Sequence, residues 1–276
     1  MICAVKEFQS ILPQWLRQEV DESVITELQE LRLRLHAPVE LVMRNSTKWL
    51  NKNVTKDDLQ FCINAASRYS PWNAVSASFG YLTAPGGHRI GICGDAVCKG
   101  GQMTGIRDVT SLCIRVAKDF RGLAEGIPIE GSILILGAPG WGKTTLLRDL
   151  IRHISNSGYH IAVVDERQEL FPSGIYDHGP RTDILSGCTK GDGIDAVLRT
   201  MGPDWIAVDE ITEERDSNAL LRAGWCGVRL LATAHAASYR DYLNRSVYRP
   251  LAESRLFDCV VLLKPDKTWH IERGNP

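Results

Sequence analysis

Five short, continuous apolar runs divide the second half of the chain, and segments of helical periodicity lie between them. The runs are residues 133–136, 161–164, 205–208, 228–232 and 260–263. Strands of a parallel sheet that is covered by helices on both faces have this character, because neither face meets water. The pattern predicts an α/β domain over residues 121–276, built on a mainly parallel sheet between helices.

The first half shows a mixed pattern, which predicts a smaller N-terminal α+β domain over residues 1–120. Apolar residues recur at helical spacing and predict a helix over residues 21–35. The apolar run 39–43 predicts a short strand. Thr55 precedes two acidic residues and a one-sided apolar pattern, as in a helix with an N-cap and acid in its first turn.

A turn signal lies between two short apolar segments in the same half. Pro85-Gly86-Gly87 separates residues 81–83 from residues 89–92, which predicts a β-hairpin. Residues 112–116 alternate between apolar and other side chains and predict a further strand. The glycine- and proline-containing segment 116–131 is the expected boundary between the two domains.

The composition is that of an ordinary globular protein, with 44% hydrophobic and 24% charged residues in a chain of 276. The net charge of -1 gives no bulk field that would attract nucleic acid or an anionic membrane. Eight scattered cysteines without a CxxC pair favour a reducing cytosol over a disulfide or zinc framework. No signal core or membrane-length apolar run is present. We therefore expect a cytoplasmic protein that binds no nucleic acid and reaches a membrane only through partners.

A glycine-rich segment directly follows the first apolar run. Residues 137–144 match the pattern G-x-x-x-x-G-K-[ST], and a helical pattern begins at Thr144. Glycines let successive backbone N–H groups point at phosphate oxygens, and the helix start adds partial positive charge. The predicted ATP-binding residues are Gly137, Ala138, Pro139, Gly140, Trp141, Gly142, Lys143, Thr144 and Thr145.

Two side chains of this segment have predicted roles in chemistry. We expect Lys143 to bridge the β- and γ-phosphates and the Thr144 hydroxyl to ligate Mg²⁺. An ordinary strand-to-helix turn is the alternative. Trp141 could stack on a base or on a neighbouring subunit, although cover of a surface is the favoured interpretation.

The third apolar run ends in two adjacent carboxylates, Asp209 and Glu210. A P-loop enzyme needs an acid after a second buried strand to hold the metal and its water shell, so Asp209 is the predicted Mg²⁺ partner. Glu210 is the predicted general base for the attacking water, which favours hydrolysis over transfer to a small molecule. Simple solvation of a strand end is the alternative.

Two other strand ends carry polar candidates. Asp165 and Glu166 follow the second run and are predicted to reach the same metal–water cluster; a cap and an ion pair with Arg167 are the alternative. Thr233 and His235 follow the fourth run. They would face the γ-phosphate and sense it if their strand lies beside the P-loop strand, whereas a buried structural histidine is the alternative.

Arginines can stabilise the charge that develops on the γ-phosphoryl group, often from a neighbouring subunit. The candidates are Arg89, Arg181, Arg167 and Arg115, with Arg89 and Arg181 preferred. A structural or solvated arginine is the alternative for each of them. The glycine-bounded segment 187–191 is interpreted either as a mobile loop that couples nucleotide state to a partner or as a plain connection.

The chain resembles the stage III sporulation protein AA family of endospore-forming bacteria nearly from end to end. In the first half the resemblance rests on residues 30–34, Tyr69-Ser70, residues 81–91 and residues 114–117. In the second half it rests on residues 142–149, 164–167, 181–185, 187–188, 208–211 and 232–235. Their ordered combination is more specific than the P-loop pattern alone.

The resemblance implies an ATPase with a RecA-like core, similar to the motors of type II and type IV secretion. Such motors are hexameric rings at the membrane base of a channel, here on the mother-cell side of the channel to the forespore. Membrane channel proteins of a sporulation secretion complex would be its partners. A nucleic-acid-dependent ATPase and a slow nucleotide-gated binding module remain the alternative functions.

Overall fold

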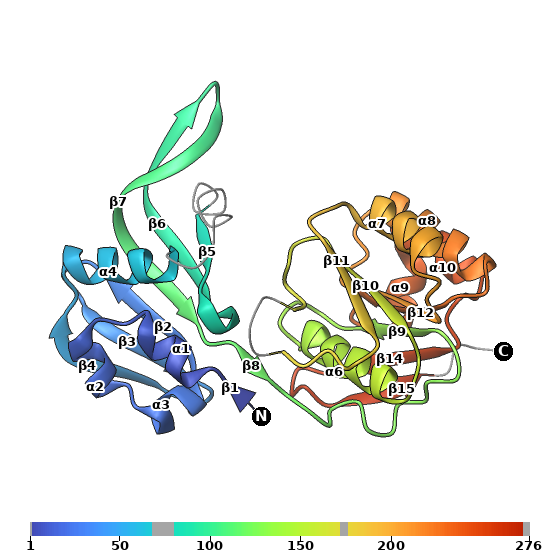
Figure 1. The fold of residues 1–276 in the computed structure, drawn as a ribbon, viewed down its shortest axis with the longest axis horizontal. Coiled ribbons are helices and arrows are strands. Elements are labelled where there is room, and N and C mark those ends of the chain that lie inside the picture. Colours follow the sequence, from blue (N-terminus) through green and yellow to red (C-terminus); the bar gives the residue numbers. More distant parts are fainter. Residues whose placement is uncertain (1, 68–79, 172–175, 273–276) are drawn as a thin grey trace. The chain divides into compact units, whose positions relative to one another are not determined.

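The computed structural model describes residues 2–67, 80–171 and 176–272 of the chain (Figure 1). The chain divides into two compact units. Of the described residues, the first unit comprises residues 2–119 and Tyr176, and the second comprises residues 120–171 and 177–272. Tyr69-Ser70, part of the family resemblance, lies outside the described residues.

The first unit is a mixed α/β structure around an antiparallel sheet of six strands in the order β4-β3-β2-β7-β6-β5. These strands are β2 (Leu28–Arg34), β3 (Pro38–Met43), β4 (Thr47–Asn53), β5 (Tyr81–Thr83), β6 (Arg89–Lys99) and β7 (Gln102–Arg115). The helices are α1 (Val5–Ser10), α2 (Gln14–Glu19), α3 (Glu22–Glu27) and α4 (Lys56–Ser67), with a 3-10 turn η1 (Pro85–Gly87). A small pair, β1 (Ile2–Cys3) with β8 (Lys118–Asp119), is antiparallel.

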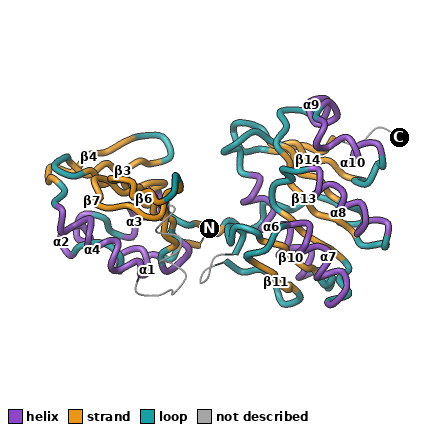
Figure 2. The backbone as a smooth tube through the Cα atoms, turned by 90° about the horizontal axis from the view of Figure 1, so that it is seen from above, coloured by secondary structure: helices purple, strands orange, loops and turns teal. Residues whose placement is uncertain are grey.

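One face of this sheet forms the core of the unit. Figure 2 shows α1, α2 and α4 on the same side of the strands. Leu31 and Leu33 of β2 and Leu112 and Ile114 of β7 are fully or almost fully buried against these helices. The alternation of buried and open positions along β2 is the period of two that a half-covered strand requires.

The predicted helix over residues 21–35 is wrong in its second half, because the helix ends at Glu27 and β2 begins at Leu28. Leu28, Leu31 and Leu35 fit a helical period, whereas Leu31 and Leu33 fit a strand period of two. Pairing of β2 with both β3 and β7 decides for the strand.

Four other local predictions for the first unit are confirmed. β5 and β6 form the antiparallel hairpin around η1, with Leu82 opposite Ile90. The strand at 39–43 is β3, and the strand at 112–116 is the end of the longer β7. Thr55 and Asp58 form a reciprocal cap at the start of α4, since Asp58 Oδ2 accepts from Thr55 N at 2.9 Å and Thr55 Oγ1 accepts from Asp58 N at 3.2 Å.

The second unit contains a seven-stranded sheet in the order β11-β10-β12-β13-β9-β14-β15. Its strands are β9 (Ile133–Leu136), β10 (Ile161–Asp165), β11 (Thr182–Ser186), β12 (Trp205–Val208), β13 (Arg229–Ala234), β14 (Cys259–Leu263) and β15 (Trp269–Glu272). All neighbours are parallel except β14 and β15. The five apolar runs correspond to β9, β10, β12, β13 and β14, as predicted.

Helices cover both faces of this sheet (Figure 2). They are α6 (Lys143–Asn156), α7 (Lys190–Thr200), α8 (Glu214–Trp225), α9 (Tyr239–Asn244) and α10 (Arg249–Glu253), with a 3-10 turn η2 (Ser246–Tyr248). α6 packs on one face with Ile133 and Ile135, and α7 and α8 pack on the other with Leu134 and Leu136. Two apolar clusters therefore sandwich strands that are buried at every position.

No helix within the described parts of the chain has the length and apolarity that a membrane crossing requires.

Candidate nucleotide-binding site

The predicted phosphate-binding segment connects the carboxyl end of β9 to the start of α6. Gly140 and Gly142 have φ angles of 78° and 103°, the left-handed region that glycine adopts without a steric penalty. Gly142 is the N-cap of α6 and supplies no side-chain cap. The positive end of the helix dipole therefore faces this loop, as an anion site requires.

Lys143 is almost fully buried, at 7% exposure, and its ammonium lies back over the loop. Its Nζ donates to Gly137 O at 2.9 Å and to Ala138 O at 3.2 Å, and it lies 2.8 Å from His235 Nδ1. Burial lowers the pKa of Lys143, while the negative charges of Asp209 and Glu210 act in the opposite direction. The cation is thus held at the place where the glycine loop would receive phosphate.

His235 joins this lysine to one of the predicted acids. The lysine ammonium has no acceptor, so Nδ1 of His235 accepts and its Nε2 carries the hydrogen. That Nε2 lies 2.9 Å from Glu210 Oε1. Lys143, His235 and Glu210 therefore form one continuous chain of polar contacts. The sequence predicted that His235 would reach the site if its strand lay beside the P-loop strand. The structure meets this condition, because β13 pairs directly with β9.

Asp209 lies directly beside the first turn of α6. Its Oδ2 accepts from Thr144 Oγ1 at 2.8 Å, and its Oδ1 accepts from Thr233 Oγ1 at 2.6 Å. A carboxylate next to a threonine hydroxyl is the hard oxygen donor set that suits Mg²⁺. Thr144 and Asp209 therefore fit the metal that the sequence predicts, and they would be its protein ligands.

Thr233 also fixes the backbone of the second acid. It is fully buried, and its Oγ1 accepts from Glu210 N at 2.7 Å. Glu210 has a φ of 50°, which is unfavourable for a residue with a Cβ and occurs where surrounding contacts enforce it. The sequence predicted that Thr233 faces the phosphate; in the structure its hydroxyl holds Asp209 and Glu210 in place.

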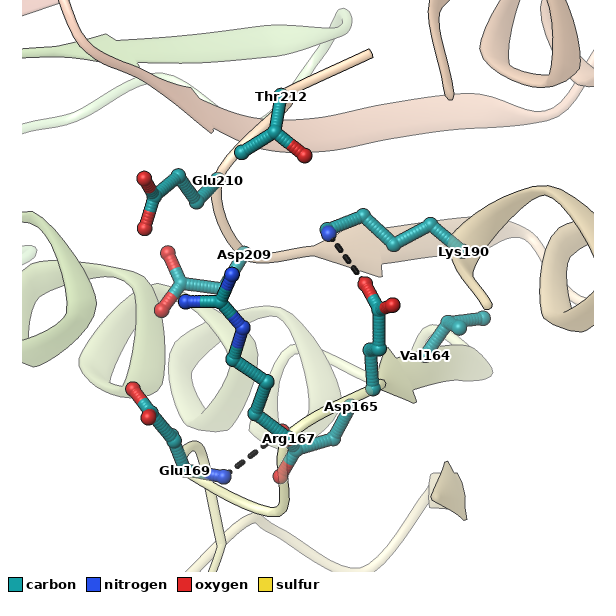
Figure 3. A pocket seen from close by; sticks show the side chains of 9 residues that line it. Val164, Asp165, Arg167, Glu169, Lys190, Asp209, Glu210 and Thr212 are labelled. Atoms are coloured by element: carbon teal, nitrogen blue, oxygen red, sulfur yellow. Dashed lines mark hydrogen bonds and ion pairs between the residues drawn. The ribbon is translucent and has the colours of Figure 1, made fainter. Parts of the chain in front are cut away.

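The loop after β10 forms the opposite wall of a pocket that Asp209 and Glu210 also line (Figure 3). Asp165 is 4% exposed, and its oxygens accept backbone N–H groups of Glu169, Leu170 and Phe171 at 2.9 to 3.3 Å. Burial raises the pKa of Asp165, and the charge of Asp209 adds to the effect. Asp165 therefore holds the backbone of the loop that follows β10, which does not begin a helix, and it also lines the pocket.

Glu166 faces a cation that the sequence reasoning missed. Lys190, at the start of α7 and 5% exposed, lies 2.6 Å from Glu166 Oε2 and 3.9 Å from Asp216 Oδ2 (Figure 3). The segment 187–191 was interpreted as a mobile loop or a plain connection, but Thr189 caps α7 and Lys190 is already helical. The threonine before an acidic first turn was the overlooked sequence signal.

The candidate arginines lie in different places. Arg167 lines the pocket, and Figure 3 shows its guanidinium directed toward Asp209. Arg181 precedes β11, at the end of the sheet opposite to the site, and its Nη1 donates to Gly158 O at 3.0 Å. Arg89 and Arg115 belong to the first unit, where Arg89 lies over the Tyr81 ring and Arg115 pairs with Glu30.

Trp141 is partly buried and packs against the apolar cluster on the α6 face of the sheet. This packing is what the surface-covering interpretation of Trp141 expects. Ala138 and Pro139 lie in the loop itself, and Thr145 follows Thr144 in the first turn of α6.

The fold is that of solved secretion and pilus ATPases, and residues 137–144 carry the P-loop sequence pattern between a strand and a helix of that fold. The structure is similar to the pilus retraction motor PilT with bound ADP, with a TM-score of 0.65 and 17% identity over 94% of this chain and 83% of that chain. It is also similar to the ATPase DotB of Legionella pneumophila, with a TM-score of 0.61 and 18% identity over 93% and 78% of the two chains. At this identity the likeness shows the fold alone.

Within that class the family is shown by sequence. Residues 5–274 match the family model described as sporulation stage III, protein AA. The chain is 35% identical over 274 residues to stage III sporulation protein AA of Bacillus subtilis (strain 168), which covers 92% of this chain and 89% of that protein. The chain belongs to this family, as its sequence motifs predicted.

Proposed function

We propose that this chain hydrolyses ATP with Mg²⁺ and acts as the oligomeric motor of a secretion-like channel complex in endospore formation. Residues 121–276 are the ATPase domain in this proposal, and residues 1–120 contact a neighbouring subunit. The observation that carries the proposal is a set of contacts at the carboxyl ends of the central strands: Lys143 with His235, Thr144 with Asp209, and His235 with Glu210.

Binding follows from the loop and the residues around it. The loop amides and the start of α6 receive the phosphates, and Lys143 exchanges its carbonyl partners for phosphate oxygens. Thr144 and Asp209 would hold Mg²⁺, which when bound would supply positive charge to offset the charge of the phosphates. Trp141 covers the apolar surface beside the loop.

Glu210 is the base in the proposed hydrolysis. Its carboxylate orients a water and accepts its proton as the water oxygen bonds to the γ-phosphorus and the bond to the β–γ bridging oxygen breaks. His235 releases Lys143 and contacts the γ-phosphate, so it senses whether that group is present. Asp165 holds the facing loop in shape, and Glu166 is placed by Lys190.

The proposed assembly is a ring, in which a neighbouring subunit supplies an arginine to the γ-phosphoryl group. Arg89 and Arg181 are the candidates that the sequence favours for this role. The ring works from the cytoplasm at the mother-cell side of the forespore membrane, which it reaches through membrane channel proteins. The family membership and the fold of secretion and pilus ATPases support this assignment.

The test separates binding from hydrolysis in two variants. Lys143→Ala should weaken ATP binding by about tenfold or more, because it removes the buried cation. Glu210→Gln should bind ATP with the parent's affinity and lower kcat by about 100-fold or more. Binding is measured with a fluorescent ATP analogue, and hydrolysis by phosphate release. Glu253→Gln, an exposed glutamate at the end of α10, is the control that should behave as the parent.

Unchanged phosphate release by Glu210→Gln would remove Glu210 as the base. Full affinity in Lys143→Ala would remove Lys143 from the site. Single-stranded DNA should leave the parent's rate unchanged, whereas stimulation that is lost at high salt would favour a nucleic-acid-dependent ATPase.

A further inference from the structure

Tyr248 of η2 connects the two turns that carry Glu210 and His235. Its hydroxyl accepts from the backbone N–H of His235 at 3.2 Å and donates to the carbonyl of Ile211 at 3.3 Å. Ile211 directly follows Glu210 in the chain. One phenol therefore bridges the carboxyl end of β13 and the turn after β12.

The position of Tyr248 is itself well determined. The residue is 4% exposed, and its ring stacks on that of Tyr242 with centroids 5.1 Å apart and planes 19° apart. The buried hydroxyl of Ser217 on α8 donates to the carbonyl of the adjacent Val247 at 2.7 Å. Packing therefore fixes the phenol in one position. The two turns can keep their hydrogen bonds to its hydroxyl only in the arrangement that the structure shows.

The two turns that Tyr248 bridges carry side chains in close contact, His235 and Glu210. Nε2 of His235 lies 2.9 Å from Glu210 Oε1, while the backbone of Glu210 is in the left-handed region. Such a backbone conformation persists only when its surroundings enforce it. Thr233 of β13 holds the backbone of Glu210 through contacts to Glu210 N and Ile211 N. Tyr248 of η2 holds the same turn through its hydrogen bond to Ile211 O.

We infer that Tyr248 is a positioning residue for hydrolysis: its hydroxyl sets the spacing of Glu210 and His235 without touching substrate. The inference rests on the proposed ATPase function and adds to it the helical segment that follows β13. Displacement of a catalytic group by a fraction of its contact distance lowers the rate far more than it lowers nucleotide affinity.

The test compares two tyrosines of one stack. Tyr248→Phe removes the bridging hydroxyl and keeps the ring. Tyr242→Phe is the matched control, because the Tyr242 hydroxyl is buried and has no hydrogen-bond partner among the described residues. Both variants keep the aromatic ring and remove only a hydroxyl group, so both should fold. Each is measured for kcat with Mg²⁺ and ATP, for affinity for an ATP analogue and for hydrogen exchange of the His235 amide by mass spectrometry.

We expect Tyr248→Phe to lower kcat about five- to tenfold, with nucleotide affinity within twofold of the parent and faster exchange at His235. Tyr242→Phe should match the parent in all three. A parent-like kcat in Tyr248→Phe, or an equal loss in both variants, overturns the role of Tyr248 and leaves the proposed ATPase intact. A parent chain that binds no nucleotide and releases no phosphate at any concentration overturns both.

Discussion

At the scale of single residues, His88 shows how a side chain from a recognised motif can have a purely structural task. It lies in the Pro-Gly-Gly-His-Arg turn and is fully buried. Its Nδ1 accepts from Ala117 N at 3.0 Å, so its Nε2–H donates to Ala4 O at 3.1 Å. Burial lowers the pKa of His88 from 6.5 to about 4, with the Ala4 contact and the charge of Glu7 opposing.

This environment predicts a pH-dependent stability. The folded pKa lies below the unfolded one, so the unfolded chain binds more protons as the pH falls below about 6.5. His88 should therefore lower the free energy of unfolding by up to about 1.4 kcal/mol per pH unit between pH 6.5 and 4. Protonation would also place a second hydrogen against Ala117 N–H.

His88→Gln is the matched variant, since an amide can donate and accept but does not titrate in this range. Urea unfolding of both proteins from pH 7 to pH 4 measures the effect. The parent should lose more stability than the variant over this interval, and parallel curves would show that His88 does not titrate as described.

Residue-level reasoning from the sequence predicted side chains that the structure brings together at the candidate site, but not all of their partners. The motif spacing identified Lys143, Thr144, Asp209 and Glu210, because the P-loop pattern requires acids after a second buried strand. Nothing in the sequence pointed to Tyr248. It lies at the end of η2, after α9, and reaches the turns that carry His235 and Glu210 only in the folded structure.

At the scale of elements, the sequence predicted the strands that are continuous apolar runs, and it did not predict the edge strands of the sheet. β9, β10, β12, β13 and β14 are buried on both faces, so their sequences are continuous and apolar. β11 and β15 lie at the edges of the sheet, and their mixed residues carry no comparable signal. The segment 21–35 fits two periods, and pairing with neighbouring strands decided between them.

The turn η1 offers a test of how closely two elements of the first unit pack. Gly86 has a φ of 75°, and a Cβ built there would lie 2.5 Å from Ala4 Cβ and 3.0 Å from Glu7 Cβ, at the start of α1. Gly86→Ala should therefore lower the free energy of unfolding by about 1 to 3 kcal/mol more than a substitution that changes φ preference alone.

Gly100→Ala is the control, because Gly100 also has a positive φ, of 58°, but its Cβ would meet nothing within 4 Å. Chemical denaturation of both variants separates steric overlap from backbone preference. Equal losses in the two would mean that α1 gives way to the added methyl group.

At the scale of the whole molecule, the proposed ring makes activity depend on assembly. Specific ATPase activity should rise with protein concentration and reach a plateau, because a neighbouring subunit completes each site with an arginine. Phosphate release is measured over a dilution series, with light scattering on the same samples. A constant specific activity across samples that scatter as monomers would contradict the shared site.

The sequence by itself determined those features that depend on residues close together in the chain or on the period of apolar positions. The P-loop spacing, the acidic pair and the uninterrupted apolar runs predicted a nucleotide site on a parallel sheet, and ordered motifs predicted the family. Only the tertiary structure decided which groups meet. Strand order brought β13 between β9 and β12, so that Thr233 could hold Asp209 and Glu210 and His235 could join Lys143 to Glu210. Those contacts depend on the pairing of distant strands, which no local pattern of residues encodes.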